Sequence, residues 1–121
     1  MIRRAAALAC ALVLAAGTAP AQEPAAPGTG GVLRGLDKIT TELRDLDLAN
    51  GQSAEFGSLT VQLIECRYPE GNPAGDAFAH VRIRETEGGA LLFDGWMLAS
   101  SPALNPLEHA RYDVWVMRCT T

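Results

Sequence analysis

The alternation of apolar and polar residues between Ala77 and Arg84 is the feature that most limits what this chain can fold into. Small or branched apolar residues occupy every second position, and the positions between them hold Phe78, His80, Arg82 and Arg84. A period of two indicates a β-strand with one buried face. Residues 58–68 alternate in the same way, with a one-residue change of phase that is typical of a β-bulge and keeps Cys66 on the buried face.

The other segments also favour strands, joined by turns rich in Gly and Pro. Residues 37–48 fit a strand pair or a short helix, and their β-branched cluster favours the strands. Asn50-Gly51 and Gly88-Gly89 are turn signals, the second joining the alternating strand to residues 91–98. Residues 69–76 have the composition of a loop, and residues 112–119 are apolar on both faces, which predicts a central strand.

Residues 100–110 contain two Pro-based signals, Ser101-Pro102 and Asn105-Pro106. Each resembles a helix cap followed by Pro at the first helical position, so one or two short helical turns are expected here. The sequence therefore predicts an all-β domain, either a small antiparallel β-sandwich or a partly open barrel, with one or two short helical turns. The pattern leaves the choice between sandwich and barrel open.

The N-terminus has the three parts of a secretory signal peptide. Arg3 and Arg4 precede an apolar run over residues 5–16, and Ala19-Pro20-Ala21 predicts cleavage between Ala21 and Gln22. The run is shorter than the roughly 20 residues that a membrane span needs, so we expect a periplasmic protein with no span after cleavage. Cys10 lies inside the run and leaves with the peptide; a lipid attached to Cys10 is the alternative.

We therefore expect a signal peptide over residues 1–21, a disordered leader over 22–32 and a single β domain over 33–121. Without Arg3 and Arg4 the chain has eight basic against fourteen acidic residues, a net charge of −6. Such a surface argues against nucleic acid as a partner. The two remaining cysteines, Cys66 and Cys119, predict a disulfide in an exported chain, with two buried free thiols as the alternative.

Several short motifs carry a resemblance to a known family. They are residues 33–38 (LRGLDK), 56–59 (FGSL), 76–78 (DAF), 95–104 (GWMLASSPAL) and 112–115 (YDVW). With them the chain resembles the DUF2155 family of exported alphaproteobacterial proteins over residues 33–119, and two cysteines at the positions of Cys66 and Cys119 fit the family. Ala110 stands where the family pattern has Pro. The resemblance implies no established activity; the genes of the family often lie near one for an accessory subunit of respiratory complex I.

Candidate site residues gather between Trp96 and Trp115. Ser100, Ser101, His109 and Asp113 suggest a hydrolase, but the strained turn that holds a nucleophilic Ser is absent, and the two serines fit caps. We expect neither a catalytic residue nor a cofactor.

The two histidines, His80 and His109, lack the third protein ligand that a catalytic zinc site uses, so we expect no metal. The two tryptophans are expected to anchor the core, and Phe78 to face outward among charges, as in a binding patch.

The candidate binding surface comprises Phe78, His80, Trp96, Ser100, Ser101, His109, Tyr112 and Asp113. The favoured function is a non-enzymatic binding or accessory module for another envelope protein. The alternatives are a small periplasmic hydrolase or carbohydrate-active enzyme, an accessory factor linked to a respiratory complex, and a structural envelope protein without a specific ligand. The oligomeric state does not follow from the sequence.

Overall fold

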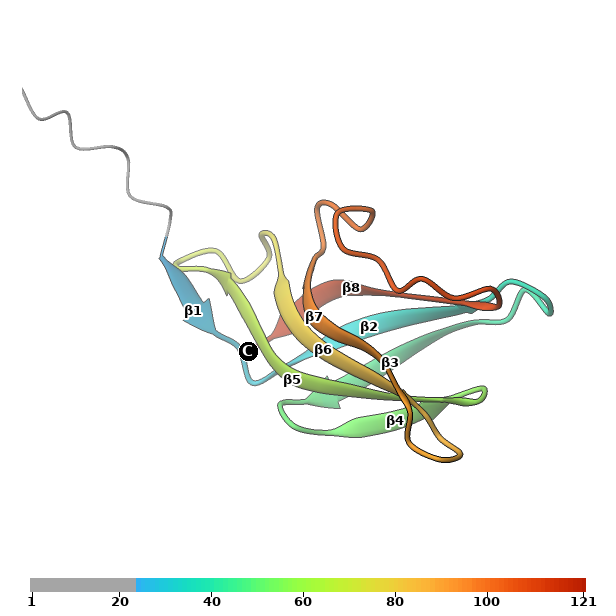
Figure 1. Ribbon diagram of the computed structural model, residues 1–121. Helices are drawn as coiled ribbons and strands as arrows, with labels where there is room; N and C mark the ends of the chain where they lie inside the picture. The colour runs from blue at the N-terminus through green and yellow to red at the C-terminus, as the bar shows by residue number, and fades with distance from the viewer. Residues whose placement is uncertain (1–23) are drawn as a thin grey trace, which may run out of the picture.

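The computed structural model describes residues 24–121, and this part of the chain is built from eight strands without a helix (Figure 1). The strands are β1 (Ala25–Pro27), β2 (Gly30–Asp37), β3 (Leu43–Ala49), β4 (Ser53–Phe56), β5 (Leu59–Pro69), β6 (Phe78–Glu85), β7 (Leu91–Leu98) and β8 (Tyr112–Thr120). The all-β prediction is therefore confirmed. None of the described residues form a helix long and apolar enough to cross a membrane.

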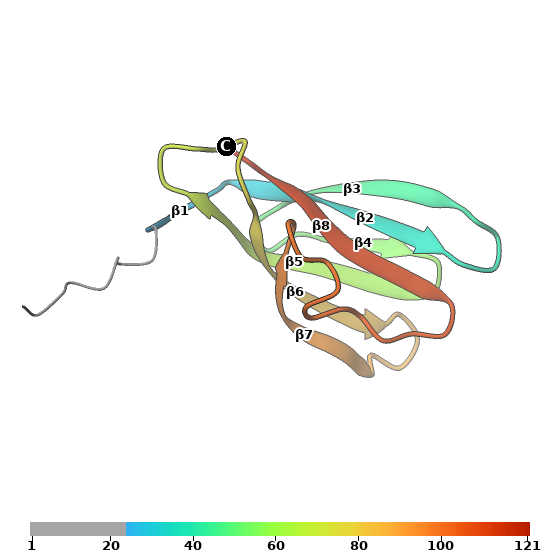
Figure 2. The ribbon, with the colours of Figure 1, turned by 90° about the horizontal axis from the view of Figure 1, so that it is seen from above.

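The strands form two antiparallel sheets that are not closed into a barrel. The larger sheet has the order β1-β5-β6-β7, with β4 also paired to β5, and the smaller one has the order β3-β2-β8. The two sheets pack against each other as a sandwich (Figure 2). Leu33 and Val116 from the smaller sheet meet Val61, Val81 and Ile83 from the larger one, and all five are at most 1% exposed.

The strand patterns explain these placements. The alternating residues of β6 lie as predicted, because Ala77, Ala79, Val81 and Ile83 are fully buried. The predicted change of phase in β5 is confirmed as a break in its register with β6 between Leu63 and Glu65, and it leaves Cys66 fully buried. Residues 37–48 are the end of β2, a turn and β3, so the strand interpretation of this segment is confirmed.

The predicted helical turns in residues 100–110 are wrong. Ser101 N–H bonds to the Leu98 carbonyl, and Leu104 N–H bonds to the Ser101 carbonyl, so Pro102 takes the second position of a β-turn. Pro suits that position as well as it suits the first position of a helix, which is why the sequence signal is ambiguous. We call residues 99–111, which join β7 to β8, the strap.

The prediction of a central position for the last strand is also wrong, because β8 is at the edge of its sheet. Its inner face packs in the core, and on its outer face Trp115 lines the hollow beneath the prolines of the strap. The side chains of β8 do not alternate between its two faces along the whole strand. A bulge at Met117 returns Cys119 to the buried face that carries Val116, whereas strict alternation places them on opposite faces.

The prediction of a disordered leader over residues 22–32 is wrong for residues 24–32. β1 pairs with the end of β5, and β2 already begins at Gly30. Residues 24–31 are held by backbone hydrogen bonds, such as Gly28 N–H to the Cys66 carbonyl at 2.8 Å, rather than by large buried side chains. Composition detects buried side chains, so it misses a strand of this kind. The predicted signal peptide, residues 1–21, lies outside the described residues.

Candidate functional site

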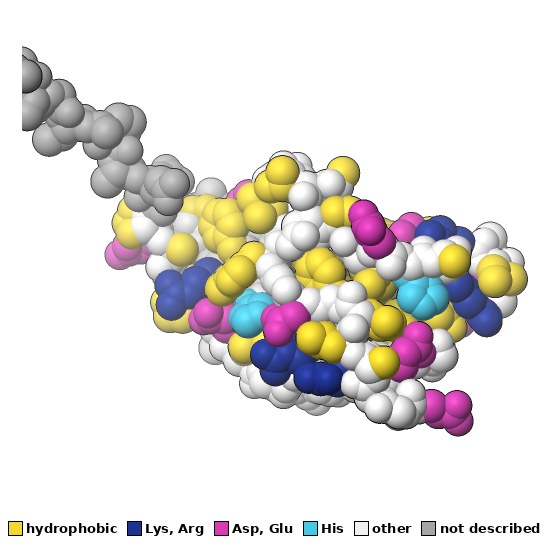
Figure 3. All heavy atoms as spheres, in the orientation of Figure 1, with side chains coloured by type: hydrophobic (Ala, Val, Ile, Leu, Met, Phe, Trp, Pro, Cys, Tyr) yellow, Lys and Arg dark blue, Asp and Glu magenta, His cyan; other side chains and the backbone are white. Residues whose placement is uncertain are grey.

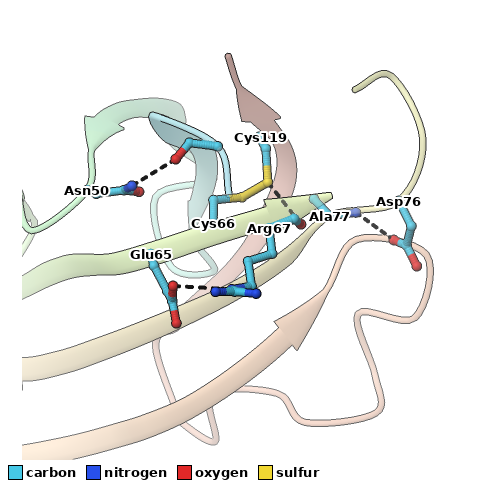
Figure 4. Close-up of a disulfide and its surroundings, with 8 residues drawn as sticks. Asn50, Glu65, Cys66, Arg67, Asp76, Ala77 and Cys119 are labelled. Carbon is cyan, nitrogen blue, oxygen red and sulfur yellow. Dashed lines mark hydrogen bonds and ion pairs between the residues drawn. A yellow bond between two sulfur atoms is a disulfide. The ribbon is translucent and has the colours of Figure 1, made fainter. Parts of the chain in front are cut away.

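A disulfide between Cys66 and Cys119 ties the two sheets together (Figure 4). Cys66 belongs to β5 and Cys119 to β8, and their Cα atoms are 5.6 Å apart, within the usual range for a disulfide. The predicted pairing is confirmed. Gly31 packs against it, and a Cβ atom on Gly31 would lie 3.1 Å from the Cys66 sulfur.

The outer faces of β6 and β7 carry a stacked pair of rings. His80 and Trp96 are cross-strand neighbours, and their rings stack with centroids 5.3 Å apart and planes inclined by 25°. The Asp94 carboxylate lies 2.7 Å from His80 Nε2 and accepts a hydrogen bond from Arg82 Nε at 3.2 Å. These hydrogen bonds, first from His80 and then from Arg82, hold the pKa of Asp94 below its usual range. The carboxylate is therefore ionised at neutral pH and fixes both neighbours.

We call this surface the Trp96 face; it comprises Phe78, His80, Arg82, Asp94, Trp96 and Leu98. Phe78 lies half-buried beside Leu98 on β7 and opposite Arg67 on β5. Figure 3 shows hydrophobic side chains mixed with histidine, acidic and basic ones on the side that carries β6 and β7. Trp96 is 39% exposed, so the expectation that it anchors the core is wrong. The same expectation is wrong for Trp115, which is half-buried on the outer face of β8.

Ser100 and Ser101 serve the local structure of the strap. Asp76 accepts hydrogen bonds from Ser100 N–H at 2.9 Å and from the Ser100 hydroxyl at 2.6 Å, which joins the start of the strap to the start of β6. Ser101 accepts in the turn described above. The interpretation of both serines as helix caps is therefore wrong, because Ser100 bonds to Asp76 and Ser101 takes part in a β-turn through its backbone. Neither serine is hydrogen-bonded to a histidine within residues 24–121.

His109 is held as a structural side chain. Its Nδ1 accepts backbone N–H groups from Arg111 at 3.0 Å and from Tyr112 at 3.2 Å. An accepting Nδ1 places the proton of the neutral ring on Nε2, which lies 3.9 Å from a Glu85 carboxylate oxygen. Neither ring nitrogen is then free to act as a base. Asp113 pairs with Lys38 at 3.6 Å rather than with His109, so these residues do not form a hydrolase triad.

Tyr112 does not belong to a surface. It is 3% exposed, its ring packs edge-on against Phe56, and its hydroxyl accepts the Ser58 N–H at 3.2 Å. Its inclusion in the candidate binding surface is therefore wrong. The other members divide into two groups, one around Trp96 on the larger sheet and one around His109 and Asp113 at the end of the strap. Within the described chain, no three His, Cys, Asp or Glu side chains lie close enough to share a metal ion.

Sequence reasoning missed the most buried acidic residue. Asp37 is 4% exposed and accepts hydrogen bonds from Ile39 N–H at 2.9 Å, Thr40 N–H at 3.2 Å and the Arg111 guanidinium at 2.9–3.2 Å. The Arg111 hydrogen bonds are the main reason that the pKa of Asp37 lies far below its usual range. The signal was present, because an Asp at a strand end before a Thr-rich turn is typical of a side chain that caps the turn.

The hollows that residues 24–121 form include two that are open to the surface. One, of about 230 Å³, lies between the strap and β8, and Pro102, Pro106 and Leu107 line it opposite Val114 and Trp115. The other, of about 300 Å³, lies between the β4–β5 turn and the β6–β7 hairpin. The first is mainly apolar, and the second is bordered by Glu85 and Glu87.

These features define a small two-sheet domain with one inter-sheet disulfide and an ordered aromatic surface. Residues 31–119 match the family model described as "Uncharacterized protein conserved in bacteria (DUF2155)". The chain belongs to the DUF2155 family.

A relative supports this assignment. An uncharacterized protein of Rickettsia prowazekii (strain Madrid E) is 31% identical over 94 residues, which is 75% of this chain and 61% of that protein. The chain thus spans about three fifths of the length of this relative. No solved structure matches the chain.

Proposed function

We propose that the protein is a non-enzymatic binding module of the periplasm, which contacts another envelope protein through β7 and the first half of the strap. One observation carries the proposal. Six large hydrophobic side chains are exposed in the described residues, and four of them, Leu91, Leu92, Trp96 and Leu104, fall between residues 91 and 104. All four belong to β7 or to the strap that follows it, and exposed apolar side chains on adjoining segments are candidates for an interaction site.

The Trp96 face adds order to this apolar surface. His80 stacks on Trp96, and Asp94 holds His80 through a 2.7 Å contact, so the indole is fixed before a partner arrives. A fixed aromatic side chain loses little conformational entropy on binding, and Trp is enriched among the residues that dominate binding energy. The paired Arg82 and Asp94 next to it form a polar rim, as is common around the apolar centre of an interface.

Export is part of the proposal. The charged, apolar and small-residue parts of residues 1–21 support a signal peptide, and the inter-sheet disulfide supports an oxidising compartment. The test is N-terminal sequencing of the protein recovered from a periplasmic fraction. The proposal expects the first residue to be Gln22, and an intact Met1 in the membrane or the cytoplasm would contradict it.

Affinity capture from envelope extracts tests the binding role. Wild type and two variants, Trp96→Ala and Leu104→Ala, are compared with Leu43→Ala, whose side chain is 55% exposed on the other sheet. We expect one or more envelope proteins to be enriched by wild type and Leu43→Ala, and enrichment to fall at least tenfold with Trp96→Ala. Equal enrichment by wild type and all three variants would show that the partner does not bind through β7 and the strap. Capture of a polysaccharide or a small molecule, without a protein, removes the proposed function.

A further inference from the structure

The free edge of β8 carries backbone groups without a strand to pair with. Residues along an antiparallel strand alternate between bonding their neighbour and pointing away from it. Lys38 N–H donates to the Arg111 carbonyl at 2.8 Å, which sets this alternation for β2 and β8. Counting from that bonded pair, the N–H and C=O groups of Val114 and Val116 point away from β2. They lie on the side of the sheet where no strand follows.

The strap covers this edge without pairing with it. Val114 is 4% exposed and Val116 is 1% exposed, so water has little access to either residue. No backbone hydrogen bond joins residues 99–111 to Val114 or Val116. Pro102 and Pro106 have no N–H to offer, and the hollow of about 230 Å³ remains between the strap and β8. Buried backbone groups without partners are costly, so a strand that pairs with them satisfies this edge better than the strap does.

The segment of the strap over this edge has few attachments. From residue 101 to residue 108 it is exposed except at Leu107, which is 4% exposed and packs in the core. The amide of Asn105 donates to the Trp96 carbonyl at 3.0 Å. The end of the strap is held far more firmly, by the hydrogen bonds of Arg111 to Asp37 and of Lys38 to the His109 carbonyl. Moving residues 101–108 aside therefore breaks the packing of Leu107 and one side-chain hydrogen bond of Asn105, while residue 111 stays in place.

We propose that the edge of β8 is a strand-addition site for a second copy of this chain, reached when residues 101–108 of the strap move aside. Two copies of β8 then run antiparallel about Trp115, because only that register pairs Val114 with Val116 of the second copy. Tyr112 N–H is not free to extend the pairing, since it already donates to His109. The result is a continuous six-stranded sheet with the order β3-β2-β8-β8-β2-β3.

Charge complementarity is the reason to choose a second copy as the occupant. Asp113 and Arg118 lie on the outer face of β8, on either side of Trp115. The antiparallel register places Asp113 of each copy beside Met117 and Arg118 of the other, so two attractive contacts form. The two Trp115 rings meet at the centre on the same face, where aromatic cross-strand pairs stabilise sheets. No like charges are brought opposite each other on β8.

Sedimentation equilibrium of the purified protein tests the proposal, because it measures self-association in the absence of any envelope partner. Asn105→Ala and, separately, Leu107→Ala loosen the strap; we expect each to lower the dimer dissociation constant at least tenfold. Asn105→Ala removes one exposed hydrogen bond, so it stays informative if Leu107→Ala fails to fold. Asp113→Lys in the Asn105→Ala background is expected to weaken the dimer at least tenfold, and Asp113→Lys with Arg118→Asp to restore it.

Hydrogen exchange gives a second readout. The amides of Val114 and Val116 are expected to become protected at dimer-forming concentrations, whereas those of Asp45 and Asp47, on the opposite edge of the same sheet, stay unchanged. The proposal is overturned if Asn105→Ala remains monomeric at millimolar concentration. It is also overturned if a dimer forms but its dissociation constant is the same with Asp113→Lys as without it. A dimer that leaves the Val114 and Val116 amides unprotected overturns the proposal as well. The capture experiment with Trp96→Ala does not depend on whether the dimer forms. The partner proposal and the dimer proposal can therefore fail separately.

Discussion

Removing the disulfide is expected to cost this domain a large part of its stability. The perturbation is the double variant Cys66→Ala/Cys119→Ala, compared with oxidised wild type. Alanine is chosen instead of serine, because serine would place a hydroxyl group at each of two buried positions; Cys66 is 0% and Cys119 7% exposed. The bond joins strands of different sheets, and its two cysteines are 53 residues apart in sequence. It therefore limits how far these two parts of the chain can separate when the protein unfolds.

The number of residues between the two cysteines sets the size of the stabilisation. In the chain-entropy description, closing a loop of about 54 residues lowers the entropy of the unfolded chain enough to stabilise the fold by about 4 kcal/mol at 25 °C. That is a large fraction of the roughly 5–15 kcal/mol by which domains are stable. For a domain of about 100 residues, 1 kcal/mol corresponds to about 4–8 °C in Tm, so a shift of roughly 15–30 °C is expected.

Urea unfolding followed by tryptophan fluorescence and circular dichroism measures the difference. Wild type treated with a reductant is the matched control, because it loses the covalent link and keeps both sulfur atoms. Reduced wild type and the double variant should unfold at similar urea concentrations, both well below oxidised wild type. If the free energy of unfolding of oxidised wild type exceeds that of both by less than about 1 kcal/mol, the entropic reasoning is wrong for this fold.

Three further predictions test the contacts described above, two of them with a control variant. Asp37→Asn should lower the urea midpoint at pH 7. Because the folded pKa of Asp37 lies below its ordinary value of 3.8, its ionised form stabilises the fold above about pH 4, and the difference between variant and wild type should shrink as the pH falls to about 3. Gly57→Ala should destabilise by about 1–3 kcal/mol, since Gly57 has φ +56° and its Cβ would overlap the Tyr112 hydroxyl. Gly51→Ala, with φ +83° and open space around it, isolates the backbone part of that cost. Leu33→Ala should cost about 2–5 kcal/mol by leaving a cavity, whereas exposed Leu43→Ala should change the free energy of unfolding by less than about 0.5 kcal/mol; equal effects would place the core elsewhere.

Patterns that depend on one strand were read correctly from the sequence. The buried positions of β6 and the bulge of β5 follow from which side chains avoid water. The pairing of Cys66 with Cys119 follows instead from the two cysteines that an exported chain would keep. The period of two is enough for this, because it does not matter which strand lies next door. The all-β class follows from the same signal repeated along the chain.

Features that depend on neighbours were missed. β8 looks central by composition, because its outer face meets the strap, and composition does not distinguish a strap from a strand. β1 has no large side chains to bury and is held by backbone pairing with β5, which leaves no hydrophobic pattern. Both tryptophans were expected to anchor the core, yet Trp96 lies at the surface, stacked on a histidine that a carboxylate holds. Such a position depends on residues from two strands, and a single-strand pattern does not contain it.

The candidate site shows the same limit in chemical terms. Ser100, His109 and Asp113 have the residue types of a hydrolase, but each already has a structural partner: Asp76 for the serine, two backbone N–H groups for the histidine and Lys38 for the aspartate. The partners of Ser100 and His109 hold the strap at its start and its end, whereas Asp113 lies on β8; the middle of the strap over β8 has few attachments. Ser100 and His109 therefore act as anchors of the strap. Their strength decides how readily the edge of β8 is uncovered, so weakening Asp76–Ser100 should promote the same dimer as weakening Asn105.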